Sequence, residues 1–448
     1  MFDKILIAHR GEIAVRIIRA CREMRIATVA VYSTADENAL HVRLADERVC
    51  IGPPANRDSY LNIPSLITAA LITGAQAIHP GYGNLSENAS FAENCEACKI
   101  KFIGPPAAVI ERMGDKVSAK RAMRAAGVPV VPPDTDMAIT DDREALRLAT
   151  RLGYPVMIKA SAGGGGRGIR VVHSDEDLAR SLPIARAEAQ AAFGKPEVYL
   201  EKYLEEPRHV EVQILSDAHG NFVHLGEREC SIQYRHQKLI EETPCPNLSP
   251  KLRAALCQAA LRGARAIGYV GAGTMEFLVD REQHLYFLEM NTRIQVEHPV
   301  TEMVTGLDLI KEQIRVAAGE RLGYGQKEIQ RKGHAIECRI TAQDPEAHFG
   351  AAAGRVVSYL VPGGPGVRVD SHLYPGYEVP PYYDPLLAKV VAWGRDRREA
   401  VARMARALGE MEVEGIKTSL PFHRKVMQNA FFRKGEVTVN FITRRMRL

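Results

Sequence analysis

The sequence of 448 residues lacks a hydrophobic run that approaches the ~20 residues needed to span a bilayer. Its first residues lead directly into a strand-like stretch, without the charged and apolar regions of a signal peptide. These two absences predict a cytoplasmic protein with no membrane contact. At 46% hydrophobic and 25% charged residues, the chain is long enough for two or three domains.

Clustered cysteines and blocks of one charge are also lacking. The 8 cysteines are scattered, and the one CxxC, Cys95 with Cys98, has no second pair or nearby His to complete a zinc site. Free thiols in a reducing compartment are the better interpretation. The formal charge is only +5, and no Lys/Arg block indicates a nucleic-acid partner. A slight basic excess suits small anionic substrates.

The N-terminal residues have the pattern of a parallel α/β sheet. Residues 4–8 are apolar, 11–24 have helical periodicity and 28–32 are β-branched, which predicts strand, helix and strand. No G-x-G-x-x-G follows the first strand, which disfavours a dinucleotide site. Residues 77–83 predict a strand that ends in a glycine-punctuated loop, where open α/β sheets place ligands. We place the end of this first domain at residue 114, after a turn at 104–106.

The rest of the chain divides into a middle domain, 115–330, and a last domain, 331–448. In the middle domain, residues 113–126 predict a helix starting at Asp115, and about 131–203 form a compact α/β insert that we interpret as a lid. Two hairpins follow, and the second, 274–279 with 285–290, would bring Glu276 beside Glu289. The last domain has predicted strands at 334–340, 355–359 and 386–392 and a helix at 397–408.

A glycine loop at the tip of the insert is a candidate phosphate site. Gly163, Gly164, Gly165 and Gly166 would let the backbone approach a polyphosphate closely. Lys159 precedes the loop at strand spacing and would add a positive charge. A flexible surface turn is the alternative, and the loop lacks the Lys-Ser/Thr ending of a P-loop. With Lys116 also upstream, nucleotide binding is the better hypothesis.

The stretch 287–299 reads as an active-site floor if it is extended, because alternate side chains then share one face. That face carries Glu289, Asn291, Arg293, Gln295 and Glu297. It would hold a cation, an anion and a base in turn, with Glu297 roughly 26 Å from Glu289 if the stretch is fully extended. The alternative is an edge strand with a solvated polar face.

A metal site and an oxyanion pocket complete the candidates. Glu276, Glu289 and Asn291 offer the oxygen ligands that Mg²⁺ prefers, and two carboxylates facing across strands need a cation. The alternative is a pair of solvated surface acids. Residues 229–238, which we place after a strand, are dense in donors and fit an oxyanion pocket; the donors are Gln233, Arg235, His236 and Lys238.

Taken together, these motifs resemble the biotin carboxylases of the ATP-grasp superfamily over essentially the whole chain. The most specific is Glu289-Met290-Asn291-Thr292-Arg293-Ile294-Gln295-Val296-Glu297, and others lie at 10–14, 79–83, 159–168, 201–203, 208–211, 235–238 and 380–384. The resemblance implies an α/β (α+β) fold: an N-terminal Rossmann-like domain, an ATP-grasp domain with a glycine-loop lid, and a C-terminal biotin carboxylase domain. The chain departs from the family pattern at His9, Asn84, Tyr234 and within 341–354, and of these Asn84 and the changes within 341–354 lie near the expected approach of biotin.

The resemblance also implies roles for individual residues. ATP would contact Lys116, Lys159, the four glycines, Glu201, Lys202, Leu204, His209, Gln233, His236, Glu276 and Leu278. Bicarbonate would be held by Lys238, Arg293, Gln295 and Val296, biotin by Tyr82 and Arg339, and Mg²⁺ or Mn²⁺ by Glu276, Glu289 and Asn291. The catalytic residues would be Glu297, Arg339, Lys238 and Arg293, with Glu297 as the base.

The implied reaction is ATP-dependent carboxylation of biotin by way of carboxyphosphate. Biotin would be carried on a separate biotin carboxyl carrier protein that also serves carboxyltransferase subunits, as in the first half-reaction of acetyl-CoA carboxylase in fatty acid synthesis. A homodimer is implied too, with Arg16, Arg19 and Glu23 on one face of the first helix. The alternatives are a component of another acyl-CoA or pyruvate carboxylase, a different ATP-grasp ligase, and a non-catalytic nucleotide-binding paralogue.

Overall fold

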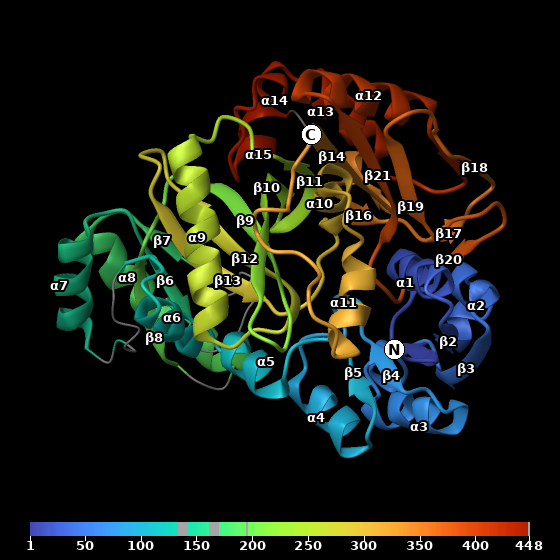
Figure 1. The fold of residues 1–448 in the computed structure, drawn as a ribbon. Coiled ribbons are helices and arrows are strands. Elements are labelled where there is room, and N and C mark those ends of the chain that lie inside the picture. Colours follow the sequence, from blue (N-terminus) through green and yellow to red (C-terminus); the bar gives the residue numbers. More distant parts are fainter. Residues whose placement is uncertain (133–138, 140, 161–169, 194–195, 447–448) are drawn as a thin grey trace.

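The computed structural model describes residues 1–132, 139, 141–160, 170–193 and 196–446. The chain passes from an N-terminal α/β unit, through a large antiparallel sheet, to a C-terminal unit covered by helices (Figure 1). None of the helices in the described ranges is both long and apolar enough to traverse a lipid bilayer.

The N-terminal unit is a parallel sheet, as the sequence predicts, and it has five strands in the order β3-β2-β1-β4-β5. Its core forms because the apolar faces of β1 and α1 meet: Ile5 and Ile7 pack with Ile13 and Ile17. The strands are β1 (Lys4–Ile7), β2 (Ala27–Ser33), β3 (Glu47–Gly52), β4 (Ala77–His79) and β5 (Lys101–Phe102), and the helices are α1 (Gly11–Glu23), α2 (Leu40–Leu44), α3 (Ile63–Thr73), α4 (Ala89–Ala97) and α5 (Ala107–Gly114).

An eight-stranded antiparallel sheet in the order β13-β12-β9-β10-β11-β14-β21-β19 joins the middle of the chain to its C-terminal part. Because β11 pairs directly with β14, side chains from the two regions share one surface. The strands are β9 (Arg208–Ser216), β10 (Phe222–Tyr234), β11 (Gln237–Thr243), β12 (Gly271–Val279), β13 (Leu285–Asn291), β14 (His334–Thr341), β19 (Val367–Ser371) and β21 (Leu386–Gly394).

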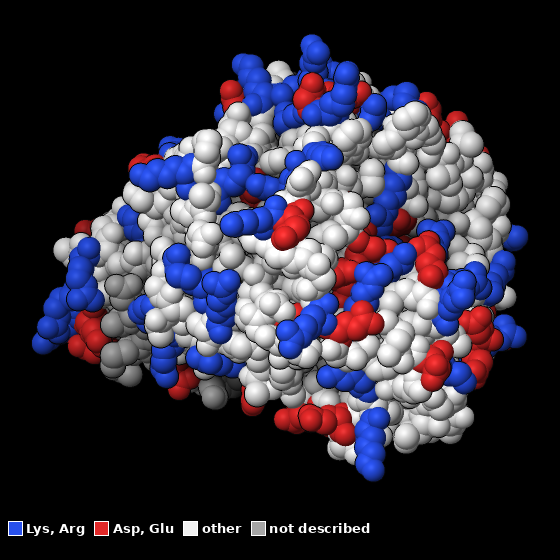
Figure 2. Space-filling view, in the orientation of Figure 1, with Lys and Arg blue, Asp and Glu red and all other residues white. Residues whose placement is uncertain are grey.

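Helices cover this sheet. Apolar residues of α9 (Pro250–Ala266) pack on β9 and β12, and α10 (His298–Thr305) and α11 (Leu309–Ala317) follow β13. The C-terminal helices are α12 (Arg397–Glu410), α13 (Leu420–Gln428), α14 (Ala430–Lys434) and α15 (Phe441–Arg445). Figure 2 shows many blue side chains over these helices with red ones between them, and α12 carries paired charges such as Arg406 with Glu410 at 2.7 Å.

A smaller unit with its own apolar core lies beside the large sheet (Figure 1). It contains the three-stranded sheet β7-β6-β8 and two covering helices. Its elements are α7 (Asp142–Leu152), β6 (Val156–Ala160), β7 (Arg170–Val172), α8 (Asp175–Phe193) and β8 (Val198–Lys202). The helix α6 (Lys116–Ala125) precedes it, and Asp115 caps that helix by accepting from the Ser118 backbone N–H at 2.7 Å.

One predicted strand, 355–359, is wrong: the chain changes sheets within it. β17 (Gly354–Arg355) pairs with β20 (Glu378–Val379), whereas β18 (Ser358–Leu360) pairs with β22 (Glu412–Glu414). The reason is that the two residues between bond different neighbours, since Val356 donates to the Tyr377 carbonyl and Val357 to the Glu414 carbonyl. The remaining short strands are β15 (Gln343–Asp344) and β16 (Gly350–Ala351).

The face of α1 proposed for a dimer contact is also partly wrong. Arg16 is buried and its Nη2 donates within the chain to Glu302 Oε1 at 3.0 Å and Asp308 Oδ1 at 2.6 Å. Glu23 accepts from Lys311 at 2.5 Å. Spacing on an isolated helix places Arg16 with Arg19, but the packing of α1 against α11 removes it from the surface.

Candidate functional site

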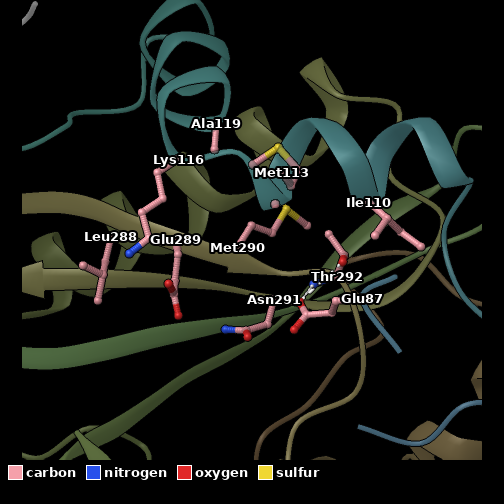
Figure 3. A pocket seen from close by; sticks show the side chains of 11 residues that line it. Glu87, Ile110, Met113, Lys116, Ala119, Leu288, Glu289, Met290, Asn291 and Thr292 are labelled. Carbon is pink, nitrogen blue, oxygen red and sulfur yellow. Dashed lines mark hydrogen bonds between the residues drawn. The ribbon is translucent and has the colours of Figure 1, made fainter. Parts of the chain in front are cut away.

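The predicted pairing of Glu276 with Glu289 is confirmed: they are directly opposite across β12 and β13. Glu276 is buried, whereas Glu289 is exposed to a pocket at the edge of the sheet. Figure 3 shows Lys116 reaching from α6 toward Glu289, with Asn291 and Glu87 along the same floor. The pocket therefore combines one acid of the hairpin, Glu289, with a lysine from another element, and Glu276 lies opposite Glu289 on the neighbouring strand.

Glu276 is held as an anion by cationic and amide donors. Its Oε1 accepts from Lys238 Nζ at 2.8 Å, Asn291 Nδ2 at 2.8 Å and Gln295 Nε2 at 2.7 Å, and its Oε2 lies 2.8 Å from His209 Nε2. Burial alone would raise its pKa, but Lys238 and His209 outweigh burial and lower it.

Glu289 has the opposite character. Its enclosure within the pocket walls and then the charge of Glu276 raise its pKa, although the side chain itself remains accessible. Of these two facing carboxylates only Glu276 is well neutralised. A divalent cation would relieve the remaining repulsion between them. Glu276, Glu289 and Asn291 therefore fit a cation that takes oxygen ligands.

The expected extended floor is wrong beyond Asn291, where β13 ends. Two contacts with the N-terminal unit turn the chain away. The Thr292 backbone N–H and Arg293 Nε each donate to Glu87 at 2.9 Å, and Ile294 enters the apolar cluster that contains Ile13. Glu297 then lies at the N-cap of α10.

This bend brings the predicted base close to the metal site instead of far along a strand. Lys238 Nζ donates to Glu276 at 2.8 Å, to Glu297 Oε1 at 2.7 Å and to Glu211 Oε2 at 2.5 Å. Glu297 Oε2 accepts from Arg339 Nη2 at 2.8 Å. Burial would raise the pKa of Glu297, but Lys238, Arg339 and Arg228 hold it well below its usual range.

Arg339 extends from β14, and its backbone is fixed from behind. Its carbonyl accepts from Ser419 Oγ at 2.9 Å and lies 2.7 Å from His423 Nε2. Its guanidinium forms ion pairs with Glu297 and Glu241, while its buried Nε has no hydrogen-bond partner among the described residues. Arg339 therefore has one donor that the described residues leave unsatisfied.

The sequence interpretation missed the residues beneath this cluster, Arg228 and Glu211. Arg228 is fully buried and joins three strands to α10. It donates to Glu211 Oε1 (2.6 Å), Gln213 Oε1 (2.7 Å), Thr274 Oγ1 (3.1 Å), Gln295 Oε1 (2.9 Å) and Thr301 Oγ1 (3.0 Å). The available signal was a run of charged residues inside an otherwise apolar strand, which requires buried partners.

The four predicted bicarbonate residues have different surroundings. Gln295 is fixed between Arg228 and Glu276, and the Val296 carbonyl accepts from Lys389 Nζ at 3.0 Å. Arg293 bonds Asn291 Oδ1 at 2.8 Å and Glu87 at 2.9 Å. Three of the four thus lie on the short, bent segment before Glu297, and the fourth, Lys238, donates to the Glu297 carboxylate.

Tyr82 and Lys389 connect this segment to the N-terminal unit. The Tyr82 hydroxyl donates to Glu12, which is 3.1 Å from the fully buried Lys389 Nζ. Since Lys389 also donates to the Val296 carbonyl, one ammonium links α1, β21 and the segment before Glu297. The predicted biotin contact Tyr82 and the predicted base therefore belong to one network.

The predicted nucleotide residues form a second group. Lys159 and Lys120 both contact the Glu201 carboxylate, and burial, then Lys120 and Lys116, lower the pKa of Lys159 to about 7. Lys202 Nζ instead donates to the Gly153 carbonyl at 2.7 Å. The four glycines predicted to bind phosphate, 163–166, lie outside the described residues.

The predicted donor cluster lies within a hairpin and not after a strand, so that placement is wrong. β10 continues to Tyr234 because Ile232 pairs with Ile240 on β11. Gln233 Nε2 is 3.4 Å from His209 Nδ1, whereas His236 is exposed in the turn. Leu204 and Leu278 are both partly buried.

Three family models match this chain. The description "Biotin carboxylase, N-terminal domain" matches residues 1–110, "Carbamoyl-phosphate synthase L chain, ATP binding domain" matches 115–324 and "Biotin carboxylase C-terminal domain" matches 337–444.

Curated relatives and solved structures match at full length. A biotin carboxylase of Nostoc sp. is 58% identical over 98% of both chains, and Biotin carboxylase 1 of Bacillus subtilis is 56% identical over 99% of this chain and 98% of its own. The biotin carboxylase domain dimer of Hydrogenobacter thermophilus 2-oxoglutarate carboxylase, solved with MgADP, ADP and bicarbonate, is similar with a TM-score of 0.92 at 50% identity, over 99% of this chain and 97% of that one.

Proposed function

The chain belongs to the biotin carboxylase family of ATP-grasp ligases, and on this premise we propose that it uses ATP and bicarbonate to carboxylate biotin on a separate carrier protein. The observation that carries the proposal is the position of Glu297. Its two oxygens accept from Lys238 and Arg339, and Lys238 also contacts Glu276 of the candidate metal site. The proposed base Glu297, the cations Lys238 and Arg339, and the proposed metal ligand Glu276 thus lie together, as a reaction of ATP, bicarbonate and biotin requires.

In the proposed first step, Glu297 takes the proton of bicarbonate. Lys238, Arg293, Gln295 and the Val296 backbone hold the anion, and its arrival competes with Glu297 for Lys238. That competition weakens the contact that keeps the pKa of Glu297 low. The freed bicarbonate oxygen attacks the γ-phosphorus of ATP, and ADP leaves with the electrons of the broken bond, which gives carboxyphosphate.

In the second step, carboxyphosphate separates into CO₂ and phosphate. Phosphate takes the N1 proton of biotin, and the nitrogen attacks CO₂. Arg339 and Tyr82 are the proposed contacts of biotin, and Arg339 stabilises the negative charge that develops on the ureido oxygen. The unpartnered Nε of Arg339 supports this role.

The metal site is proposed at Glu276, Glu289 and Asn291, where the raised pKa of Glu289 beside Glu276 supports binding of a divalent cation. When bound, Mg²⁺ or Mn²⁺ would neutralise charge on the transferring phosphoryl group. For ATP we propose contacts from Lys116, Lys159, the glycines 163–166, His209 and Glu276, as well as Glu201, Lys202, Leu204, Gln233, His236 and Leu278.

We propose domain boundaries at 114/115 and 330/331, with 131–203 as the approximate lid. A homodimer is supported by the dimeric relative, although Arg16 is engaged within the chain. Acetyl-CoA carboxylase is the proposed holoenzyme, with a biotin carboxyl carrier protein and carboxyltransferase subunits as partners. The eight free thiols are compatible with a cytoplasmic location.

The decisive experiment is bicarbonate-dependent ATP cleavage with and without free biotin. We expect cleavage to require bicarbonate and to rise with biotin, and carboxybiotin to form. Stimulation by a different carboxyl acceptor would favour another ATP-grasp ligase, and ATP binding without turnover would favour a non-catalytic paralogue. Supplying carrier protein and carboxyltransferase subunits with acetyl-CoA or pyruvate then tests the holoenzyme, and sedimentation tests the dimer.

A further inference from the structure

Two buried glutamates lie behind Arg339 without an assigned role. Glu241 on β11 and Glu337 on β14 are directly opposite one another in the sheet, and both are fully buried. Glu337 and Arg339 alternate along the same strand, so their side chains share one face with Glu241. This face lies at the junction of the middle and C-terminal parts of the chain (Figure 1).

The pair is poorly compensated. None of its four carboxylate oxygens has a hydrogen-bond partner of good geometry among the described residues, although Glu241 Oε1 forms an ion pair with Arg339 Nη2. Two buried carboxylates that face each other cannot both stay ionised without a cation between them. One member must therefore hold a proton.

The surrounding charges decide which one is protonated. Glu337 faces Lys389, but that ammonium is already engaged by Glu12 at 3.1 Å and by the Val296 carbonyl at 3.0 Å. Burial raises the pKa of Glu337 well above its usual range. Burial also raises the pKa of Glu241, but only to about 7, because Arg339 and Lys238 lower it while Glu297 raises it further. Arg339 forms its ion pair with Glu241 and not with Glu337, so the negative charge is favoured on Glu241 and the shared proton on Glu337.

One nitrogen of Arg339 thus has two anionic partners, and only one of them, Glu241, stays ionised after the first proposed step. Its Nη2 pairs with Glu297 at 2.8 Å and with Glu241. Once Glu297 has accepted the bicarbonate proton, it is neutral and holds Arg339 only weakly. The contact with Glu241 is unaffected, because Glu241 is fully buried and takes no proton in the proposed first step.

We propose that Glu241 is a positioning residue that keeps the Arg339 guanidinium in place for biotin after Glu297 has been protonated. This inference rests on the proposed function, because it assigns Arg339 to biotin. Glu241 itself touches neither substrate. Its carboxylate keeps a contact with Arg339 when the contact with Glu297 is weakened between the first and the second proposed step.

The test compares Glu241→Gln with Glu337→Gln, a matched change on the facing strand. Glu241→Gln removes the negative charge that faces Arg339, so carboxybiotin formed per ATP cleaved should fall about tenfold or more, as expected for loss of a charged hydrogen bond. Glu337→Gln replaces a group that is already neutral and should leave this ratio within about twofold of wild type. A lower ratio at saturating biotin separates this effect from weaker binding of biotin.

Equal ratios in both variants, or a wild-type ratio for Glu241→Gln, would overturn the proposal. If Glu241→Gln does not fold, Glu241→Asp carries the test, because it keeps the charge but withdraws it from Arg339 by one methylene. A crystal structure gives a readout that does not need activity, with Glu297→Gln standing for the protonated, neutral Glu297. The Arg339 guanidinium should keep its place in Glu297→Gln alone and leave it when Glu241→Gln is added. If wild-type protein fails to carboxylate biotin, the proposed function fails, while this displacement still tests the positioning of Arg339.

Discussion

The two ends of the segment that runs from Glu289 to Glu297 balance their charges in different ways. Glu289 is exposed to an open pocket with Lys116 on the facing wall, whereas Glu297 is almost completely buried and accepts from both Lys238 and Arg339. The first end leaves its charge to be balanced by a ligand. The second end supplies permanent counter-ions, which act strongly because burial lowers the local dielectric.

This difference suits the two tasks. A cation that arrives with a nucleotide needs an accessible, under-neutralised acid such as Glu289, which faces the buried Glu276. A proton transfer needs groups that are already in place, because reorganisation during the reaction adds to the barrier. Lys238 connects the two ends, since it contacts both Glu276 and Glu297.

The largest expected effect is at the buried end. Glu297→Gln keeps the size and can still accept from Lys238, but it cannot take a proton, so bicarbonate-dependent ATP cleavage should fall by ~10²–10⁴-fold. ATP affinity should be nearly unchanged, which calorimetry will show. Turnover like that of wild type, or loss of ATP binding, would mean that the base is assigned wrongly.

Lys389 tests how far the buried network extends. Lys389→Met removes the ammonium that joins Glu12 to the Val296 carbonyl and leaves Glu12 as an uncompensated buried charge. We expect destabilisation of ~3–5 kcal/mol in denaturant unfolding. The control is Lys311→Met, which breaks a surface pair with Glu23 and should cost only ~0–1 kcal/mol. Similar costs for both variants would contradict a buried network.

At the open end, Glu289→Gln should affect the cation and not the fold. It removes one of two facing carboxylates, so the Mg²⁺ concentration for half-maximal ATP cleavage should rise about tenfold or more. Thermal stability should not fall, because a carboxylate with a raised pKa is lost. Glu282→Gln, an exposed acid in the same hairpin, is the control. An unchanged Mg²⁺ requirement would move the metal site elsewhere.

The smallest effect concerns the pH dependence of nucleotide binding. Lys159 has a pKa lowered to about 7, and phosphates would favour its protonated form. Below pH 7 the ammonium is already present; above pH 7 binding must take up a proton. ATP affinity should therefore fall as pH rises from 7, by at most about tenfold per unit.

Calorimetry in two buffers of different ionisation enthalpy measures that proton uptake at pH 8. Lys159→Arg keeps its charge throughout this range and should bind without taking up a proton. Equal uptake by the two proteins would assign the proton to another group.

The sequence anticipated local features of the site well. Alternation along two short strands predicted that Glu276 and Glu289 are opposite each other, and the Asp115 cap fixed the start of α6. The prediction that β13 extends to residue 299 was wrong, because Glu87 and the apolar cluster around Ile294 redirect the chain after Asn291. Both partners come from the N-terminal unit, and no pattern within 287–299 reveals them.

By itself, the sequence determined the family, the parallel N-terminal sheet, the hairpin that pairs two acids and the inventory of charged residues. These follow from periodicity, turn residues and motifs, which act over a few residues. Only the tertiary structure decided that Glu276 and Glu297 share Lys238, that Arg228 underlies them, and that Arg339 has Glu241 as a second partner. Buried charges must find partners wherever the fold provides them, and here the partners come from strands far apart in the chain.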